Sequence, residues 1–581
     1  MSDKTPVFNE KKARKGKCSN LKRPKISKRR PLNRYEMEKP SVENVSSSAK
    51  KLSAIDSVDF EVDEGFSYRI LNFLVVFSAI SQGVVCKKCK SDVTFSESGK
   101  RGLGFKIVIS CQKCDKIYIP SSPFIEKGYE INRRIILAMR LVGVGLNGIM
   151  KFCAFMDLPR PIFQSCYDKI VKKIAVGAEA VCQLSIKNAA REEKEKSDEK
   201  VTNTSGITVS GDGSWRKRGF SSLFGFVSLI GWFTGKVVDV LVKSKYCKSC
   251  EYWKKRSDTE EYKEWAETHE DECQANHKGS AGKMEVDAVI EMFQRSESLH
   301  ELKYKNYVGD GDSKTFKAIL DSQAYGKFTI NKKECIDHVQ KRMGTRLRNL
   351  KKKTKGLGGK GKLTGKLIDE LSIYYGLAIR RNHHSVEKMR NEIYATLDHK
   401  LSTDDEPKHD KCPRGENSWC SWQKAQATGS DHTHKPPLSQ EVYETISPIY
   451  GELSGDKLLC RCIGGFTQNS NESFNATVWS MAPKSTSSGK HVLDTAVYIS
   501  VGIYNDGLSA IMRLMKNLDM TIGPNCYNFC VETDMRRIDF SERSLSDAAK
   551  KARTSIKESR KAEEEANIDL DGQMYGAGIA D

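Results

Sequence analysis

Residues 305–316 read KNYVGDGDSKTF, and residues 332–342 read KKECIDHVQKR. The first segment predicts an apolar strand that ends at Asp310 beside two glycines. A carboxylate at the end of a strand can hold a catalytic metal ion. The second segment carries Cys335-x2-His338 at the start of a helical pattern. A Cys/His pair so soon after a strand-end carboxylate is unusual, and it suggests that the chain carries further acidic residues and metal ligands.

The composition points to a polyanionic partner. The 581 residues carry a formal charge of +21 and include 18 cysteines. This excess of Lys and Arg favours nucleic acid, with a soluble surface and basic tails as the alternative. The frequent C-x2-C-like spacings favour zinc in a reducing compartment over disulfides. The most apolar run, Ile70 to Val85, is shorter than a bilayer span, so we expect a buried helix or strand and no membrane segment.

The ends of the chain differ in amino-acid composition from its middle. Residues 1–64 are expected to be a disordered basic tail, because they have few large apolar residues. Within them Lys22 to Arg30 (KRPKISKRR) is typical of a nuclear localisation signal, with a nonspecific basic tail as the alternative. Residues 129–200 read as helices that either dock on DNA or only pack, followed from 191 by a charged linker. Residues 541–581 form a charged tail to which we assign no chemistry.

Residues 65–128 contain two C-x2-C pairs, separated by two strand-like runs around a Gly-rich turn. Each pair bends tightly enough for both thiolates to reach one tetrahedral zinc ion, so the pattern predicts a zinc ribbon-like module. Contact of this module with DNA and a purely structural role both remain open. The predicted zinc ligands are Cys86, Cys89, Cys111 and Cys114.

Residues 201–540 are predicted to form a catalytic core. From Ile207, three adjacent strand-like runs precede a predicted helix, Met284 to Phe293, and then the strand that ends at Asp310. This order of elements indicates an α/β fold, and it is the order of an RNase H-like core.

Two more acidic residues complete a candidate metal site in this core. Asp212 follows the alternating strand ITVSG, and Glu472 lies in TQNSNESFNATVW at the start of a helical run. Phosphodiester chemistry uses carboxylates that hold two divalent ions, and Mg²⁺ prefers such oxygen ligands. We therefore predict Asp212, Asp310 and Glu472 as the metal-binding acids, with Asp312 as the main rival to Asp310.

An insertion at residues 245–280 interrupts the core with a second zinc pattern. Its C-x2-C pair is followed by a helix-like stretch in which two histidines and a cysteine recur every four residues on one face. Two of these three would complete a tetrahedral site. We expect His277 to be used and His269 to be spare. The predicted ligands are thus Cys247, Cys250, Cys273 and His277.

A further insertion, residues 340–460, is expected to be helical and is basic near its start. Its Gly/Lys segment, Lys351 to Lys366, either contacts DNA phosphates or is a solvated loop. Later in the insertion, the H-x2-C pattern at His409 and Cys412, with Cys420, suggests another zinc site, with buried reduced thiols as the alternative. The candidates for its remaining ligand are His432, His434, and Cys335 or His338 folded back.

Taken together, these motifs resemble the Mutator-like transposases, and more narrowly the animal branch with a zinc-bearing insertion. The shared motifs are SGDGSW, GDGDSK followed by C-x2-H, the finger ending NHKGSAGKME, and TQNSNESFN with Trp479 and Pro483-Lys484 nearby. The resemblance implies that Asp212, Asp310 and Glu472 are the family's DDE acids. It also implies that Cys335 and His338 are its C-x2-H signature.

The resemblance implies a nuclear DNA transposase that uses Mg²⁺ or Mn²⁺ and contains Zn²⁺. Its partners would be double-stranded DNA, namely the terminal inverted repeats of its element and the target DNA. A homo-oligomer is expected, because a transposase must join two element ends. One alternative is a domesticated or inactive transposase-derived, zinc-containing DNA-binding protein, and another is an RNase H-like nuclease acting on RNA–DNA hybrids.

Overall fold

The computed structural model describes residues 46–52, 60–200, 206–217, 221–270, 273–309, 313–359, 362–416, 418–486, 488–546, 548–553, 555–556 and 559. The predicted localisation signal at Lys22 to Arg30 and the candidate acids Asp310 and Asp312 lie outside these described residues. The chain divides into two compact units, one within Met1–Ala49 and Arg537–Asp581 and the other within Lys50–Arg536. Every site discussed below lies within the second unit.

The second unit begins with a small antiparallel sheet of order β1-β2-β3 beside helix α2. Phe73 and Phe77 of α2 pack on Phe105 and Phe95 of the sheet. The predicted burial of this apolar run is wrong, because α2 has no buried residue and Leu74 is 73% exposed. A three-stranded sheet covers only one side of the helix. The elements are α2 (Phe73–Gln82), β1 (Thr94–Arg101), β2 (Gly104–Ser110) and β3 (Ile117–Pro120).

A helical region follows, and its last helix is longer than the sequence suggests. The expected linker from residue 191 is in fact the end of α5, because Glu193 is fully buried there and accepts hydrogen bonds from the backbone N–H groups of Phe233 and Thr234. Of the helices in the described residues, none alone is long and apolar enough to cross a bilayer, whereas α3 and α4 pass that test as a pair bent by 111°. The elements are β4 (Phe124–Ile125), β5 (Gly128–Tyr129), α3 (Glu130–Leu141), α4 (Leu146–Phe155) and α5 (Gln164–Lys200), whereas α1 (Ser47–Leu52) precedes the small sheet in the chain.

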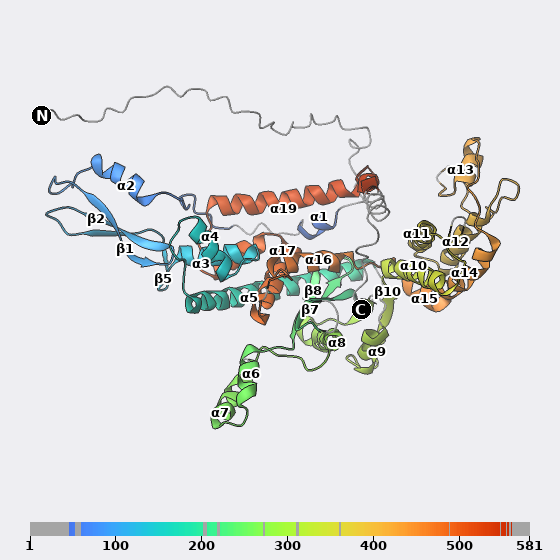
Figure 1. Cartoon of the computed structure of the whole chain (residues 1–581), viewed down its shortest axis with the longest axis horizontal. Coiled ribbons are helices and arrows are strands. Elements are labelled where there is room, and N and C mark those ends of the chain that lie inside the picture. The colour runs from blue at the N-terminus through green and yellow to red at the C-terminus, as the bar shows by residue number, and fades with distance from the viewer. Residues whose placement is uncertain are drawn as a thin grey trace, which may run out of the picture. The chain divides into compact units, whose positions relative to one another are not determined.

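The centre of the unit is a five-stranded sheet of order β10-β9-β6-β7-β8, which makes the fold mixed α/β (Figure 1). The pairs β6–β7 and β7–β8 are antiparallel, whereas β9 lies parallel to both β6 and β10. All eight positions of β7 are buried, as expected for a strand covered on both faces. The strands are β6 (Ile207–Trp215), β7 (Phe224–Gly231), β8 (Val237–Ser244), β9 (Tyr304–Gly309) and β10 (Asn331–Glu334).

Alternating side chains of β7 belong to two different hydrophobic cores. Phe226 and Ile230 join the core that includes α5, α16 and α17, while Val227 and Leu229 join the core that includes α8. This alternation follows from the two-residue period of a strand. The elements are α8 (Ala281–His300), α9 (Ser313–Asp321), α16 (Asn469–Met481), α17 (Lys490–Asp506), α18 (Ser509–Asn517) and α19 (Pro524–Leu545).

Two insertions extend from this sheet. A short one carries α6 (Lys248–Trp253), η3 (Lys254–Arg256) and α7 (Glu260–His269). The longer one is helical, as predicted, and has its own core around Leu371, Tyr375 and Tyr450. Its elements are α10 (Ile336–Lys353), α11 (Gly365–Arg381), α12 (Val386–Asp398), η5 (His399–Leu401), α13 (Ser421–Thr428), α14 (Gln440–Leu453) and α15 (Asp456–Cys462).

Candidate active site and metal clusters

The first predicted acid, Asp212, lies within the central strand β6, which continues to Trp215, and is half-buried. Strand β9 pairs with β6 in parallel, and Val308 lies opposite Ser210. In the sequence, Asp212 comes two residues after Ser210, and Asp310 comes two residues after Val308. Because Asp310 lies outside the described residues, its proximity to Asp212 stays a prediction.

Helix α16, which carries the predicted acid Glu472, is joined to β6 by side-chain hydrogen bonds. Three of these bonds are each 2.7 Å long: Gln468 Nε2 donates to the carbonyl O of Gly211, Asn475 Nδ2 to Asp212 Oδ2, and Trp479 Nε1 to Ser214 Oγ. Residues three or four apart share one face of a helix, so this spacing turns a single face of α16 toward the strand.

A fourth polar residue, which is fully buried, also holds the same helix against β6. Asn471 is fully buried, accepts from Ser210 Oγ at 2.7 Å and donates Nδ2 to the carbonyl O of Ser210 at 3.1 Å. Glu472 follows it and is exposed, and it lies about 60° around the helix from Asn475. The structure therefore brings the elements that carry Asp212 and Glu472 side by side, with Glu472 accessible to solvent.

Asn475 leaves an oxygen available beside Asp212. Its Oδ1 is buried and has no hydrogen-bond partner among the described residues. The opposite orientation of the amide would set Oδ1 against the carboxylate, so the bond to Asp212 fixes which atom is free. The sequence reasoning missed both Asn475 and Gln468. The available signal was their position one turn after and one turn before Glu472.

The C-x2-H pair lies at the edge of the sheet and takes part in no Cys/His cluster of the described residues. Cys335 is buried against Val308 and Phe466 at the start of α10, and His338 Nδ1 lies 3.0 Å from Gln468 Oε1. Of the candidates left open for the third zinc site, this pair is therefore not the one that joins Cys412 and Cys420 among the described residues. Because Gln468 donates Nε2 to the backbone of β6, its Oε1 accepts from the His338 ring.

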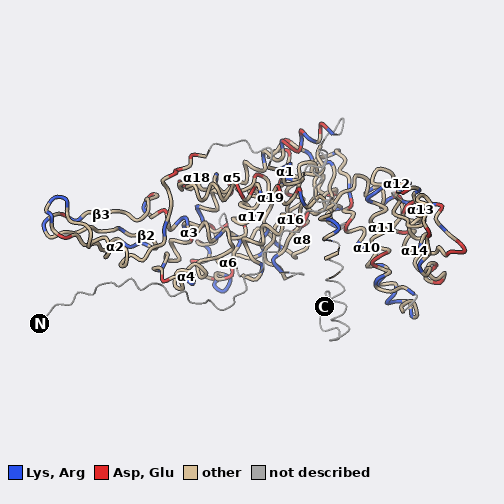
Figure 2. Tube along the Cα trace, turned by 90° about the horizontal axis from the view of Figure 1, so that it is seen from above, with Lys and Arg blue, Asp and Glu red and all other residues tan. Residues whose placement is uncertain are grey.

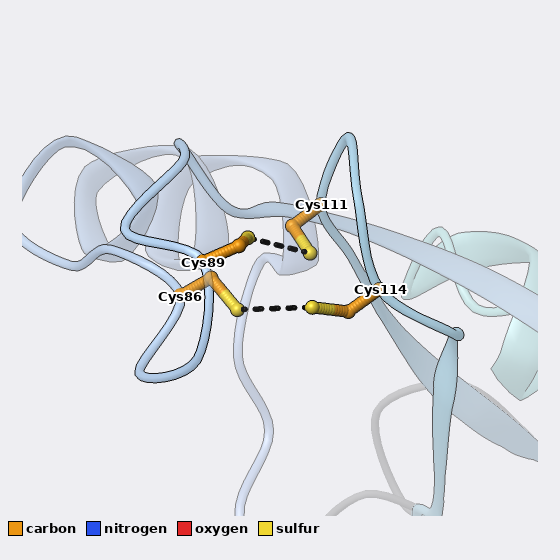
Figure 3. Close-up of side chains that lie close together, drawn as sticks. All are labelled: Cys86, Cys89, Cys111 and Cys114. Atoms are coloured by element: carbon orange, nitrogen blue, oxygen red, sulfur yellow. Dashed lines mark hydrogen bonds between the residues drawn. The ribbon is translucent and has the colours of Figure 1, made fainter.

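The first cluster of thiols lies in the two loops at the end of the small antiparallel sheet (Figure 3). Sγ of Cys86 lies 3.8 Å from that of Cys114, and Sγ of Cys89 lies 3.5 Å from that of Cys111. All four sulfur atoms are within 4.8 Å of one another, so this set could hold a zinc ion. The hydrogen bond from Ser91 lowers the pKa of Cys89 to about 6, which favours the ligating thiolate.

The second cluster consists of Cys247, Cys250, His269 and Cys273, all with ligand atoms within 4.8 Å. The ring Nε2 of His269 lies 3.2 Å from Sγ of Cys250 and 3.4 Å from Sγ of Cys247. The predicted ligand His277 is instead buried with its Nδ1 3.3 Å from Asp287, so that assignment is wrong. The reason is that α7 ends at His269, and the four-residue spacing no longer describes one helical face beyond it.

The third cluster consists of His399, His409, Cys412 and Cys420, again within 4.8 Å. The remaining ligand position is taken by His399, which was not among the predicted candidates. His432 contacts Ser421, and His434 contacts the outer nitrogen of His409. The side-chain hydrogen bond with Cys412 lowers the pKa of the Cys420 thiol, which favours the ligating thiolate.

A basic chain with a mixed α/β sheet and Cys/His clusters fits the class of nucleic-acid-binding proteins with zinc modules. A family model described as Mutator-like transposase matches residues 67–420. The match covers more than half of the sequence, and the chain belongs to the Mutator-like transposase family. Membership supports a transposase function and implies DNA binding, and the predicted family is confirmed.

The matched range contains Asp212 and all three clusters, whereas Glu472 lies beyond it. No curated protein and no solved structure matches the chain. The narrower assignment to the animal branch stays a prediction.

Proposed function

We propose that the chain cuts the ends of its own element and transfers the freed 3′-hydroxyl strands to target DNA, with Asp212, Asp310 and Glu472 as the DDE acids. The observation that carries this proposal is the set of hydrogen bonds that holds α16, with Glu472, against β6, with Asp212. The strand order, with three antiparallel strands followed by two parallel ones, supports an RNase H-like core.

The donor atoms suit a hard divalent cation such as Mg²⁺ or Mn²⁺. Asp212 and Glu472 offer carboxylate oxygens, and the buried, unpartnered Oδ1 of Asn475 offers a further oxygen. Such ions, when bound, activate a water or a 3′-hydroxyl and stabilise the leaving oxygen. The chain itself positions Asp212: Asn475 holds its Oδ2, and Gln468 holds the strand at Gly211.

Double-stranded DNA is the proposed partner, as terminal inverted repeats and as target. Three consecutive lysines, Lys351 to Lys353, fill the last turn of α10 (Figure 2) and would neutralise phosphates in a salt-dependent manner. The Cys/His clusters would hold Zn²⁺. Because a transposase must join two element ends, the proposed active form is a homo-oligomer. Because its substrate is DNA, the proposed location is the nucleus.

The test is strand cleavage by the purified full chain on duplex DNA from the element ends, with Mg²⁺ or Mn²⁺. We expect Asp212→Asn to abolish cleavage and to leave duplex binding intact, because the substitution removes the charge while the new amide oxygen can still accept from Asn475 Nδ2. The matched control is Asp321→Asn, an exposed carboxylate at the end of α9. Equal cleavage by Asp212→Asn and the parent chain would sink the proposal.

Two other outcomes would favour different functions. Tight, salt-sensitive binding without cleavage by the parent chain would favour a domesticated DNA-binding protein. Cleavage of RNA–DNA hybrids in preference to duplex DNA would favour an RNase H-like nuclease.

A further inference from the structure

The segment between α12 and α14 contributes almost nothing to a hydrophobic core. Among the described positions between Leu401 and Leu438, the buried apolar residues are limited to Cys412, Cys420 and Ala425. Its regular elements among the described residues are the 3-10 helix η5 and the short helix α13. A stretch of this size without its own core usually needs disulfides or a metal to stay folded. Cys412 and Cys420 are both free thiols, which leaves a metal.

The distances among the four ligand atoms match a tetrahedral site. Bond lengths of about 2.0 Å to nitrogen and 2.3 Å to sulfur separate two nitrogens by about 3.3 Å and a nitrogen from a sulfur by about 3.6 Å. Nδ1 of His399 lies 3.1 Å from Nδ1 of His409, and Sγ of Cys420 lies 3.5 Å and 3.4 Å from these two atoms. Sγ of Cys412 lies 4.0 Å and 3.7 Å from them.

A chain of hydrogen bonds sets the tautomer of His409. Asp404 Oδ1 accepts from both the backbone N and Nδ1 of His434, at 2.9 Å and 2.7 Å. The neutral His434 ring therefore presents Nε2 as an acceptor, and it lies 2.8 Å from Nε2 of His409. His409 must then donate from Nε2, and its Nδ1 lone pair faces the two thiols. Histidines that bind metals commonly donate their other N–H to a partner in this way.

We propose that His399, His409, Cys412 and Cys420 form a structural zinc site, and that Asp404 and His434 are positioning residues that hold His409 in its ligating tautomer. Two imidazole nitrogens and two thiolates are a donor set that zinc favours. Four protein ligands leave no open coordination position, so the ion fixes structure and does not activate water. It ties the end of α12 to the start of α13, in a stretch whose described residues beyond Leu401 add no side chain to a hydrophobic core.

The experiment measures zinc per chain in the full-length protein, purified in reductant and analysed by plasma mass spectrometry. The described residues hold three Cys/His clusters, so we expect three zinc ions in the parent and two in His399→Ala. The matched control is His432→Ala, whose ring hydrogen-bonds Ser421 and which should keep three. Three zinc ions in His399→Ala would overturn the site.

Two variants outside the ligand set keep the proposal testable if His399→Ala does not fold. Asp404→Ala and His434→Gln should retain three zinc ions at saturating zinc. A chelator should then remove one of them about 10–100-fold faster than from the parent, with protease cleavage within residues 402–437 rising in parallel. Loss rates equal to those of His432→Ala would refute the positioning role. Complete loss of one zinc in His434→Gln at saturating zinc would instead make His434 a ligand.

Discussion

Helix α16 and the segment from His399 to Leu438 are held in place by opposite means. The helix buries Asn471, Phe474, Val478 and Met481, and its amides bond to a strand of the central sheet. Between Leu401 and Leu438 the described residues of the segment add no side chain to a hydrophobic core, and four ligand atoms converge in it. A core spreads its stability over many contacts, whereas a metal concentrates it in one place. The two regions should therefore fail differently.

The largest expected effect is metal removal. A chelator should abolish amide hydrogen-exchange protection around the third cluster and leave β6 to β8 protected, because structural zinc contributes on the order of 10–16 kcal/mol to a small module. Hydrogen-exchange mass spectrometry of the full chain measures this. The control is the same chelator saturated with zinc beforehand. Loss of protection in β7 at the same rate would show that the two regions are not independent.

The second cluster, in the short insertion, provides a further test of metal dependence, because one of two neighbouring histidines is a ligand and the other is not. His269→Ala should lose one zinc per chain, since its Nε2 lies 3.2 Å from Cys250 Sγ. His277→Ala should keep all of its zinc, because that ring bonds to Asp287. Zinc analysis of both variants measures the difference. Retention of zinc by His269→Ala together with loss by His277→Ala would restore the assignment made from spacing.

The histidines show what spacing can and cannot predict. A C-x2-C pair is local, so the thiol pairs of the first two clusters could be read from the sequence. The closing ligand depends on where a helix ends: α7 stops at His269, and His399 comes directly after α12. Neither end has a strong sequence signal. The same limit hid the true length of α5, since Glu193 is satisfied by backbone N–H groups about forty residues later in the chain.

In the candidate active site, too, some residues could be predicted from the sequence and others could not. Strand alternation predicted the α/β fold and Asp212, and the start of a helical run predicted Glu472. Gln468 and Asn475 were missed because their partners on β6 are 257 and 263 residues away in the sequence. Amides carry no charge pattern or ligand spacing, so their position one turn from Glu472 was the one sequence signal, and the tertiary structure was needed to show their partners.

A smaller effect is expected in the core that supports α16. Phe474 is fully buried beside Phe226, with ring centroids 5.9 Å apart. Phe474→Ala should lower the free energy of unfolding by about 3–5 kcal/mol through lost burial and a cavity, with zinc content unchanged. Denaturant unfolding measures the change. Phe529→Ala, at a ring that is 64% exposed, should stay within about 0.5 kcal/mol of the parent, and an equal loss in both variants would contradict the assigned core.

Asn475→Ala should change the stability least of all these variants, but it should clearly change the Mg²⁺ dependence of cleavage. Asn475→Ala removes one hydrogen bond, which costs about 0.5–1.5 kcal/mol of stability. It also removes the bond to Oδ2 of Asp212 and deletes Oδ1, which has no partner among the described residues, so we expect cleavage to fall about 10–100-fold at a fixed Mg²⁺ concentration. The Mg²⁺ concentration for half-maximal cleavage should rise, and excess Mg²⁺ should restore part of the rate.

The matched control for Asn475 is Thr477→Ala on the same helix, whose hydroxyl bonds only to the carbonyl O of Ser473. A residue that merely holds the helix would lower cleavage at every Mg²⁺ concentration alike, and Thr477→Ala would behave in the same way. A shift of the Mg²⁺ dependence confined to Asn475→Ala separates orientation of the carboxylate from packing of the helix. An unchanged half-maximal concentration would show that Asn475 stabilises α16 without serving the metal site.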